Sequence, residues 1–292
     1  MGRSNRRRVR CAGRKASVMS NDYREHASTV MGRIGCRPDE TDPASGSVAV
    51  TEALSVGGVV RPSVLMLLAD MVVGMRLDPL FDEWTYTTDF SIRMTGRPTP
   101  PGASVRAVSK VLRHGRRLLI EEVDYVDDRG ERIAYAQITF MRQPLRPGEV
   151  KPELDDIKRG MMSDTVPPLV TPLVDAAGIE VVDAVAGAVS MVARDDLRRS
   201  GGFVQGAMMS LLGEVSAQAL AEAHHGHAAV VSEMDIRYLI GGRTGPLVAD
   251  AEWVGTPGSG RIMVTLLDRG HDDVVTTTFL ARAAVTLSLI HI

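Results

Sequence analysis

Hydrophobic and polar residues follow the same order twice along the chain. Each occurrence begins with a β-branched segment (47–54 and 183–193), passes a Gly-Gly turn and enters a long apolar helix, predicted over 63–77 and 207–223. Four segments of strand-like alternation follow each helix, at 85–95, 103–113, 117–127 and 132–142, and again at 229–239, 246–255, 260–268 and 273–285. The pattern predicts two copies of one unit, each a strand, a helix and four further strands.

A direct comparison of the chain with itself supports this duplication. At an offset of 144 positions, SVGGVVRPSVLMLLAD (55–70) lies over RSGGFVQGAMMSLLGE (199–214). The register continues without a gap, so TTDFSIR (87–93) lies over VSEMDIR (231–237). Self-similarity at a fixed offset is the signature of a repeated structural unit. We therefore interpret the chain as an internal duplication.

The character of the first helix limits the architecture. SVLMLLADMVVGMRL (63–77) is apolar on nearly all sides, whereas a surface helix shows one apolar stripe. Such a helix must be surrounded by sheet. The predicted fold is therefore α+β, with two tandem hotdog domains, each a curved antiparallel sheet wrapped around one central helix. Two such domains are expected to join their sheets edge to edge, because this pairs strands that would otherwise be exposed.

The expected limits follow from the same pattern. The first hotdog domain is predicted at 47–143 and the second at 183–286, joined by a linker rich in proline and charge at 144–182. Residues 1–46 are expected to form an N-terminal arm, disordered or in part a misread start, with Met19 as the favoured true start. The last residues, LSLIHI (287–292), match the translation of a common sequencing-library adapter and are interpreted as an artefact.

A carboxylate lies inside each predicted helix. Asp70 follows Leu67 and Leu68, and the repeat places Glu214 at the equivalent position. Burying an unpaired carboxylate among apolar side chains costs several kcal/mol, and buried acids are enriched at functional sites. A residue facing solvent at the domain junction, or a structural partner of an arginine, remains an alternative. Recurrence of the acid in both copies favours a functional role.

The helix-entry segments resemble a motif of the PaaI-like hotdog thioesterases, which reads roughly His-Gly-Gly, several residues, and Leu-x-Asp. The second copy carries Gln205-Gly206-Ala207 and then Leu212-Gly213-Glu214. The first carries Arg61-Pro62-Ser63 and then Leu68-Ala69-Asp70. Neither copy has the family's His. The resemblance covers about 47–142 and 183–285, most of the chain.

This resemblance implies a role for each position. The backbone N–H after the His position polarises the thioester carbonyl, and the acid eight residues later acts as nucleophile or general base. A Ser or Thr on the next strand, here Ser232 or Thr88, helps to place the water. Eight helical residues rise about 12 Å, so one helix cannot supply both groups to one carbonyl. The acid of one domain must work with the helix N-terminus of the other, and the site is expected across the domain interface.

The two copies differ at the position of the oxyanion donor. It is Gly206 in the second copy but Pro62 in the first, and proline has no N–H. The predicted working site therefore combines the Gly206 N–H, Gln205 as an orienting residue, Asp70 as base or nucleophile, and Thr88. The site of Glu214 and Ser232 is expected to be a degenerate twin. A one-residue shift of the turn, which would let the Ser63 N–H replace the missing donor, is the alternative.

Arginines and histidines give weaker signals. The phosphates of an acyl-CoA call for basic residues at the pocket mouth, and Arg97, Arg243 and Arg116 are the candidates. Each is also explained as a solvated surface charge. The cluster of His224, His225 and His227 lies where the second helix ends, so we expect helix capping and no metal site.

Composition narrows the partners. A net charge of −2 gives no reason to expect nucleic acid, and no apolar run approaches the length of a membrane span. The two cysteines imply no disulfide framework, so a cytoplasmic location is expected. Two fused hotdogs would form an intramolecular pseudo-dimer, as a monomer or as a further homo-oligomer.

The expected function is hydrolysis of acyl-CoA thioesters to free acid and CoA, without metal or redox cofactor. A non-catalytic acyl-CoA binding protein and a hotdog dehydratase or hydratase are the alternatives. A dehydratase or hydratase needs a His near an acid, and neither helix-entry motif contains a His.

Overall fold

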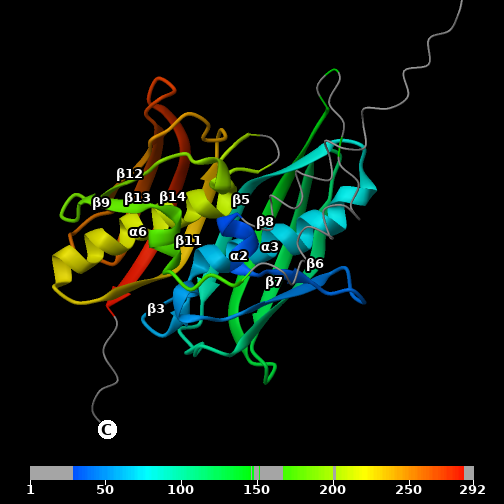
Figure 1. Cartoon of the computed structure of the whole chain (residues 1–292), viewed down its shortest axis with the longest axis horizontal. Helices are drawn as coiled ribbons and strands as arrows, with labels where there is room; N and C mark the ends of the chain where they lie inside the picture. Colours follow the sequence, from blue (N-terminus) through cyan, green and yellow to red (C-terminus); the bar gives the residue numbers. More distant parts are fainter. Residues whose placement is uncertain (1–28, 146, 148–150, 152–166, 200–201, 286–292) are drawn as a thin grey trace, which may run out of the picture.

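The computed structural model describes residues 29–145, 147, 151, 167–199 and 202–285. Within these residues, twelve strands form one continuous antiparallel sheet in the order β1-β2-β6-β7-β8-β5-β11-β14-β13-β12-β10-β9 (Figure 1). The strands of the first half are β1 (Arg37–Pro38), β2 (Ser45–Ala49), β5 (Trp84–Met94), β6 (Ser104–His114), β7 (Leu118–Val126) and β8 (Arg132–Gln143). Those of the second half are β9 (Ile179–Asp183), β10 (Ala188–Met191), β11 (Ala229–Tyr238), β12 (Leu247–Trp253), β13 (Arg261–Asp268) and β14 (Val274–Val285). A separate two-stranded hairpin joins β3 (Ser55–Val56) to β4 (Val59–Val60).

The sheet is symmetric about its centre. Each strand of the first half has its repeat equivalent at the same distance from the centre in the second half. Strands β5 and β11 meet at the centre, where Ser91 pairs with Asp235, its own equivalent at the 144-residue offset. Ion pairs flank this point: Arg93 lies 2.9 Å from Asp235, and Arg237 lies 2.9 Å from Asp89. The duplication in sequence is therefore a duplication in topology, and the two halves share one sheet.

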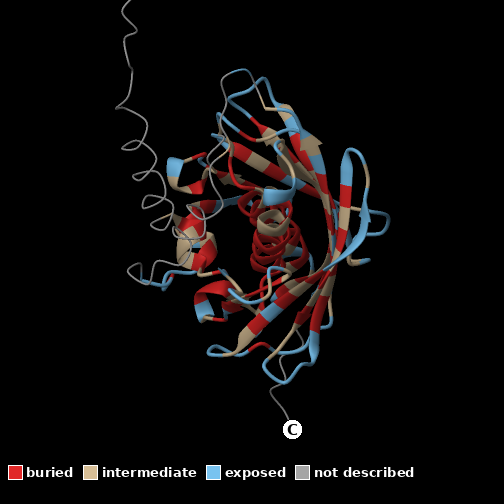
Figure 2. Ribbon diagram, turned by 90° about the vertical axis from the view of Figure 1, so that its right-hand side faces the viewer, coloured by how far each residue is buried: buried red, intermediate tan, exposed pale blue. Residues whose placement is uncertain are grey.

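One long helix lies against each half of the sheet: α3 (Pro62–Leu77) and α6 (Gly206–His225). Both are buried over most of their length, and Figure 2 shows them enclosed by the curved sheet. Helix α3 begins with Pro62, whose fixed φ suits the first turn. Helix α6 ends at Gly226, which adopts the left-handed conformation of a C-cap (φ 69°). The apolar character of both helices is explained by this enclosure.

The predicted helices and strands are confirmed to within about two residues at most ends. Regular elements also occur within the expected arm and the expected linker. Helix α2 (Val30–Ile34), strand β1 and the start of β2 lie within the expected arm, and helix α5 (Leu173–Ala177) and strand β9 lie within the expected linker. The two-residue β1 and the five-residue β9 extend the sheet at its two edges, and the two short helices bury Met31 and Leu173. These elements are too short to give a clear periodicity. The expected start at Met19 and the expected artefact at 287–292 lie outside the described residues.

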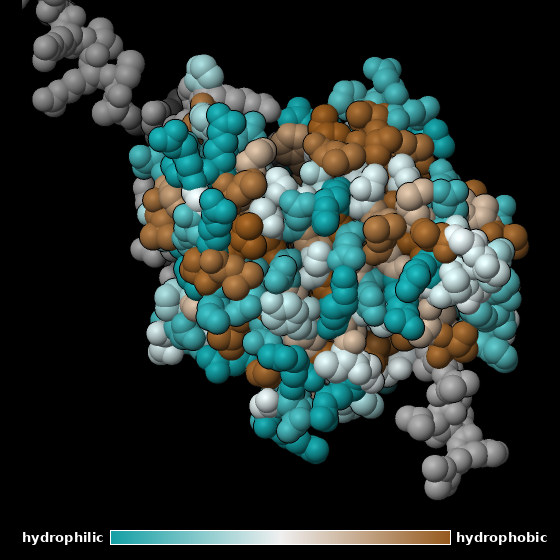
Figure 3. Space-filling model, turned by 180° about the vertical axis from the view of Figure 1, so that it is seen from behind, coloured by the Kyte–Doolittle hydropathy of each residue, from teal (hydrophilic) through white to brown (hydrophobic). Residues whose placement is uncertain are grey.

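The back of the molecule carries a mixed surface. Seen from behind, hydrophilic side chains are interspersed with smaller hydrophobic groups (Figure 3). No helix among the described residues is long and apolar enough to cross a membrane.

Two glycines in the central helices make a test of packing. A β-carbon at Gly213 of α6 would lie 2.5 Å from the buried Phe279 ring, whereas one at Gly74 of α3 would have Phe140 Cε1 as its nearest neighbour at 4.0 Å. We expect Gly213→Ala to lower the free energy of unfolding by about 1–3 kcal/mol through overpacking. Gly74→Ala, the matched control, should raise it by up to about 1 kcal/mol, because alanine favours the helix. Urea denaturation of both variants measures this, and a stabilised Gly213→Ala would contradict the packing.

Candidate active site

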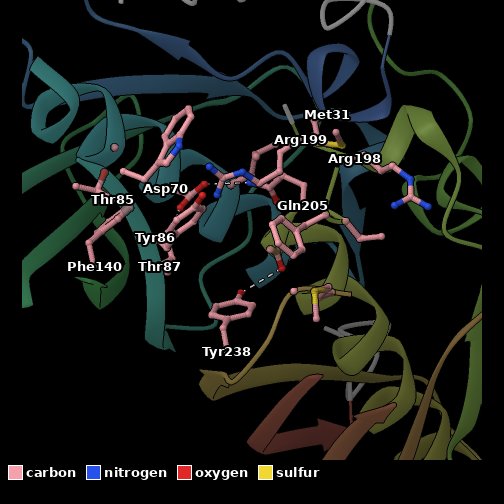
Figure 4. Close-up of a pocket in the computed structure, with 18 of the residues that line it drawn as sticks. Met31, Asp70, Thr85, Tyr86, Thr87, Phe140, Arg198, Arg199, Gln205 and Tyr238 are labelled. Carbon is pink, nitrogen blue, oxygen red and sulfur yellow. Dashed lines mark hydrogen bonds between the residues drawn. The ribbon is translucent and has the colours of Figure 1, made fainter. Parts of the chain in front are cut away.

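A cavity of about 950 Å³ lies between α3, β5 and the segment that leads into α6. Figure 4 shows residues from both halves of the chain around it, with Asp70 near its middle. Helix α3 contributes Met66, Asp70 and Gly74 from successive turns, and the start of α6 contributes Gln205 and Gly206. The cavity is therefore built by both halves of the duplication.

The Asp70 carboxylate is held by two neutral donors. The Thr87 hydroxyl donates to Oδ1 at 2.5 Å, and the Gln205 amide donates to Oδ2 at 3.0 Å. Burial raises the pKa of Asp70 above its ordinary value. The hydrogen bond from Thr87, the positive charge of Arg199 and the hydrogen bond from Gln205 each oppose that rise. Asp70 is thus a carboxyl group with a raised pKa, positioned at the wall of a cavity, which is a frequent arrangement in active sites.

Gln205 connects this carboxylate to the N-terminus of α6. It is the N-cap residue, and its side-chain oxygen accepts the Ala207 N–H while its amide donates to Asp70 (Figure 4). The Gly206 N–H has no acceptor among the described residues. A β-carbon at Gly206 would lie 3.3 Å from Met66, so glycine here leaves the approach to this N–H open. A helix N-terminus with a free N–H stabilises negative charge on a bound group.

A cation and a phenol lie in the same cavity. The Arg199 guanidinium lies over the Tyr86 ring, 4.7 Å from its centroid, and 5.9 Å from that of Trp84. Figure 4 shows it pointing toward Asp70, and it makes no ion pair with a carboxylate within the described ranges. Burial raises the pKa of Tyr238, so this phenol stays neutral, and its hydroxyl lies 3.1 Å from the Gly206 carbonyl. Around Asp70, the site therefore combines a carboxylate, an aromatic-stacked cation and uncharged donors.

The equivalent acid of the other half has different surroundings. Glu214 of α6 is fully buried, and its carboxylate accepts from the Arg61 guanidinium at 2.6 Å and from the Ser63 N–H at 3.1 Å. Arg61 is the residue before Pro62, so the N-terminus of α3 is closed by an internal ion pair. The Ser63 N–H, the expected alternative donor, is already bound by Glu214.

Each carboxylate therefore lies at the N-terminus of the other helix. This arrangement follows from the antiparallel contact of α3 with α6.

The hydroxyl beside Asp70 comes from Thr87, one residue before the predicted Thr88. A β-bulge in β5 lies between Thr87 and Asp89, and the Thr88 hydroxyl is directed to Asp89 (2.9 Å) and the Thr139 carbonyl (3.3 Å). Strand β11 has a bulge at the equivalent place, and there the Ser232 hydroxyl donates to the Arg282 carbonyl at 3.3 Å, with no hydrogen bond to Glu214. A bulge shifts the side chains that follow it by one position, and sequence alternation alone does not reveal such a shift.

The residue that corresponds to Thr87 in the second half is Val231. It is buried and has no hydroxyl to offer to Glu214.

Only one of the three arginines proposed for phosphate lies at the cavity. Arg243 lines it and stacks 3.9 Å from the Phe203 ring centroid. Arg97 instead pairs with Glu131 at 2.9 Å, and Arg116 lies on the hairpin between β6 and β7; neither lines the cavity. Arg198 and Arg199, which also line the cavity, were missed because only the tertiary fold places their loop there. His224 and His225 pack against Trp253 at the end of α6.

Solved structures with a similar fold are known. The acyl-CoA thioesterase II of Mycobacterium marinum matches with a TM-score of 0.54 and 13% identity over 88% of this chain and 97% of that chain. An acyl-ACP thioesterase of Bacteroides thetaiotaomicron matches with a TM-score of 0.56 and 12% identity, covering 82% and 97%. A protein of unknown function with a hotdog fold from Alicyclobacillus acidocaldarius matches with a TM-score of 0.55 and 11% identity, covering 89% and 97%. This chain has the hotdog fold. No family model matches the sequence, and no curated protein matches it.

The two acids of this hotdog protein should differ in their effect on stability. Glu214→Gln leaves the buried Arg61 charge without its counter-charge, which should lower the free energy of unfolding by roughly 3–5 kcal/mol. Asp70→Asn is the matched control. The raised folded-state pKa of Asp70 means that the folded protein favours the protonated carboxyl group. Its contribution to stability is therefore present at low pH and is lost as pH rises through that pKa. At pH 7, Asp70→Asn should therefore be as stable as the wild type or more stable. Thermal unfolding at pH 7 measures both, and a strongly destabilised Asp70→Asn would contradict this assignment.

Proposed function

We propose that the chain consists of two tandem hotdog domains of the PaaI-like kind and hydrolyses acyl-CoA thioesters to free acid and CoA. One observation carries the proposal: Gln205 joins Asp70 to the N-terminus of α6, where the Gly206 N–H is free at the cavity wall. An acid and an oxyanion donor on opposite domains are thus close to one another. A thioester carbonyl between them would meet both.

The reaction follows from these groups. The Gly206 N–H and the partial positive charge of the α6 N-terminus stabilise the carbonyl oxygen as it becomes negative. Asp70 removes a proton from a water molecule, and the hydroxide oxygen bonds to the carbonyl carbon. The carbon–sulfur bond then breaks, and the thiolate takes the proton from Asp70. Direct attack by Asp70, giving an anhydride that water opens, is the second route.

Thr87, rather than Thr88, is assigned to orient Asp70, together with Gln205. Both donate to the carboxylate without cancelling its charge. The CoA phosphates are assigned to the cationic end of the cavity, which Arg198 and Arg243 line.

The second site is assigned a structural role. Glu214 is neutralised by Arg61 and capped by the Ser63 N–H, so neither a water nor a carbonyl has a free partner there. Ser232 makes no hydrogen bond to it.

A non-catalytic acyl-CoA binding protein is the second candidate. The absence of the family's His from both helix entries favours it, since position 205 is Gln and position 61 is Arg. The two candidates differ in turnover, because only the thioesterase would release free thiol from acyl-CoA.

Release of free thiol from acyl-CoAs should depend on Asp70. We expect Asp70→Asn to lower kcat by about 10²–10⁴, the usual contribution of a general base. Glu214→Gln, assayed below its own melting temperature, should keep wild-type turnover per folded molecule. Turnover that survives Asp70→Asn but fails in Glu214→Gln would move the reaction to the other half. Binding without turnover by the wild type would favour the binding protein.

The pH dependence of kcat/KM should report on Arg199. The groups around Asp70 are Thr87 from β5, Gln205 from the start of α6, Tyr238 from β11, and Arg199, which alone is charged. Activity needs the carboxylate, so it should fall as pH drops through a pKa above about 3.9, the ordinary value for aspartic acid. Arg199→Met removes the charge that lowers this pKa, and the acid limb should move to higher pH.

Arg199→Lys keeps the charge and should restore the limb toward the wild-type position. His271 lines the same cavity, so His271→Gln is the second control and should leave the limb in place. An acid limb that moves with His271→Gln and not with Arg199→Met would contradict the role of Arg199.

A further inference from the structure

The cavity has two ends of different chemistry. One end is formed by the loops before α6 and after β11 and carries Arg198, Arg199 and Arg243. The other end follows α3 away from α6. Its apolar lining comes from α3 and β8, namely Met71, Met75, Phe140 and Met141. Asp70 lies between the two ends, because Met66, one turn before it, is near Gly206, and Gly74, one turn after it, faces Phe140.

Gly74 keeps the apolar end open. It lines the cavity in the interior of α3, where glycine is less favourable than alanine by about one-half to one kcal/mol. A β-carbon there would meet no atom closer than Phe140 Cε1 at 4.0 Å, so packing does not require glycine. The space beside Gly74 is the feature that glycine preserves.

The other half shows what fills this space when the site is closed. The equivalent of Gly74 is Gln218 of α6. Its side chain donates to Glu222 at 2.9 Å and approaches the Arg61 guanidinium at 3.4 Å, next to the Arg61–Glu214 pair. One half therefore has a polar side chain at this position, and the other has an opening.

The apolar end has a definite length. From Asp70 to Asp78, eight residues of α3 span about 12 Å. At Asp78 the surroundings become polar, because the Lys151 ammonium lies 2.8 Å from the Asp78 carboxylate and 2.7 Å from its carbonyl. A chain that extends beyond this point would have to displace buried charges.

We propose that the substrate is a medium-chain fatty acyl thioester, whose chain lies along α3 from Asp70 toward Asp78 and passes through the space that Gly74 leaves open. This rests on the proposed function for the position of the thioester. The methionines and Phe140 around Gly74 favour an apolar acyl group, and the length favours a chain near that of octanoate or decanoate. Gly74 is then a specificity-determining residue.

The first experiment compares the kcat/KM of the wild type for acetyl-, butanoyl-, decanoyl- and palmitoyl-CoA. The decanoyl thioester should be hydrolysed most efficiently. In Gly74→Leu, the ratio of decanoyl to butanoyl kcat/KM should fall about tenfold or more, since a few displaced methylenes account for such a change. Gln218→Met, at the equivalent position of the closed half, should keep the wild-type ratio. A preference of the wild type for acetyl- or palmitoyl-CoA, or a ratio unchanged by Gly74→Leu, would overturn the proposal.

A second experiment separates this proposal from the catalytic one. Binding of decanoyl- and butanoyl-CoA to Asp70→Asn, measured by calorimetry, does not depend on hydrolysis. Decanoyl-CoA should bind more tightly, and adding Gly74→Leu should remove the difference. If the wild type hydrolyses no thioester but this difference is found, the catalytic proposal fails and the proposed acyl-chain site beside Gly74 stands. Equal binding of the two ligands to Asp70→Asn with Gly74 intact would overturn the proposed acyl-chain site, even in an active thioesterase.

Discussion

The carboxylate of each central helix lies at the N-terminus of the other helix, and the candidate site depends on this reciprocal contact. It arises because β5 pairs with β11 in the middle of one sheet, which brings the N-terminal halves of α3 and α6 side by side in opposite directions. Neither helix could supply both an acid and a free N–H to one small group, because the two are separated by about 12 Å along the helix. The duplication thus creates two equivalent places where an acid meets a helix start.

The two places have diverged at a small number of positions. Pro62 removes the N–H that Gly206 offers, and Val231 lacks the hydroxyl that Thr87 gives to Asp70. Gln218 fills the place that Gly74 leaves open. Each change has the same direction: the half around Glu214 becomes a packed and internally paired core, and the half around Asp70 keeps a cavity. Buried polar networks are favourable only when every member is satisfied, which the pair of Glu214 and Arg61 achieves without a ligand.

Much of this could be predicted from the sequence, since the repeat offset fixes which residues are equivalent and the apolar helices require enclosure. The expected crossing of acid and helix start came from the motif that the helix entries resemble, combined with the rise of an α-helix. The hydroxyl that binds Asp70 could not be predicted, because a β-bulge brings Thr87 to Asp70 while Thr88, which also lines the cavity, donates to Asp89. Arg199 was missed for a related reason. Its neighbours Tyr86 and Trp84 are more than one hundred residues away in sequence, so no local pattern connects them. Local periodicity predicts elements, whereas irregular backbone and long-range stacking determine the details of the site.

Arg61 and Gln205 occupy equivalent positions, and the difference between them explains how one acid can remain reactive. Arg61 binds Glu214 directly and neutralises its charge. Gln205 binds Asp70 through an uncharged amide, and the nearest cation, Arg199, is held on the Tyr86 ring. A direct ion pair would stabilise the carboxylate and leave it a weak base. Neutral donors with a nearby but separate cation instead keep Asp70 ionisable, with a raised pKa and with space for a reactant. The stability that a buried ion pair provides to one half is therefore absent from the half that keeps its cavity.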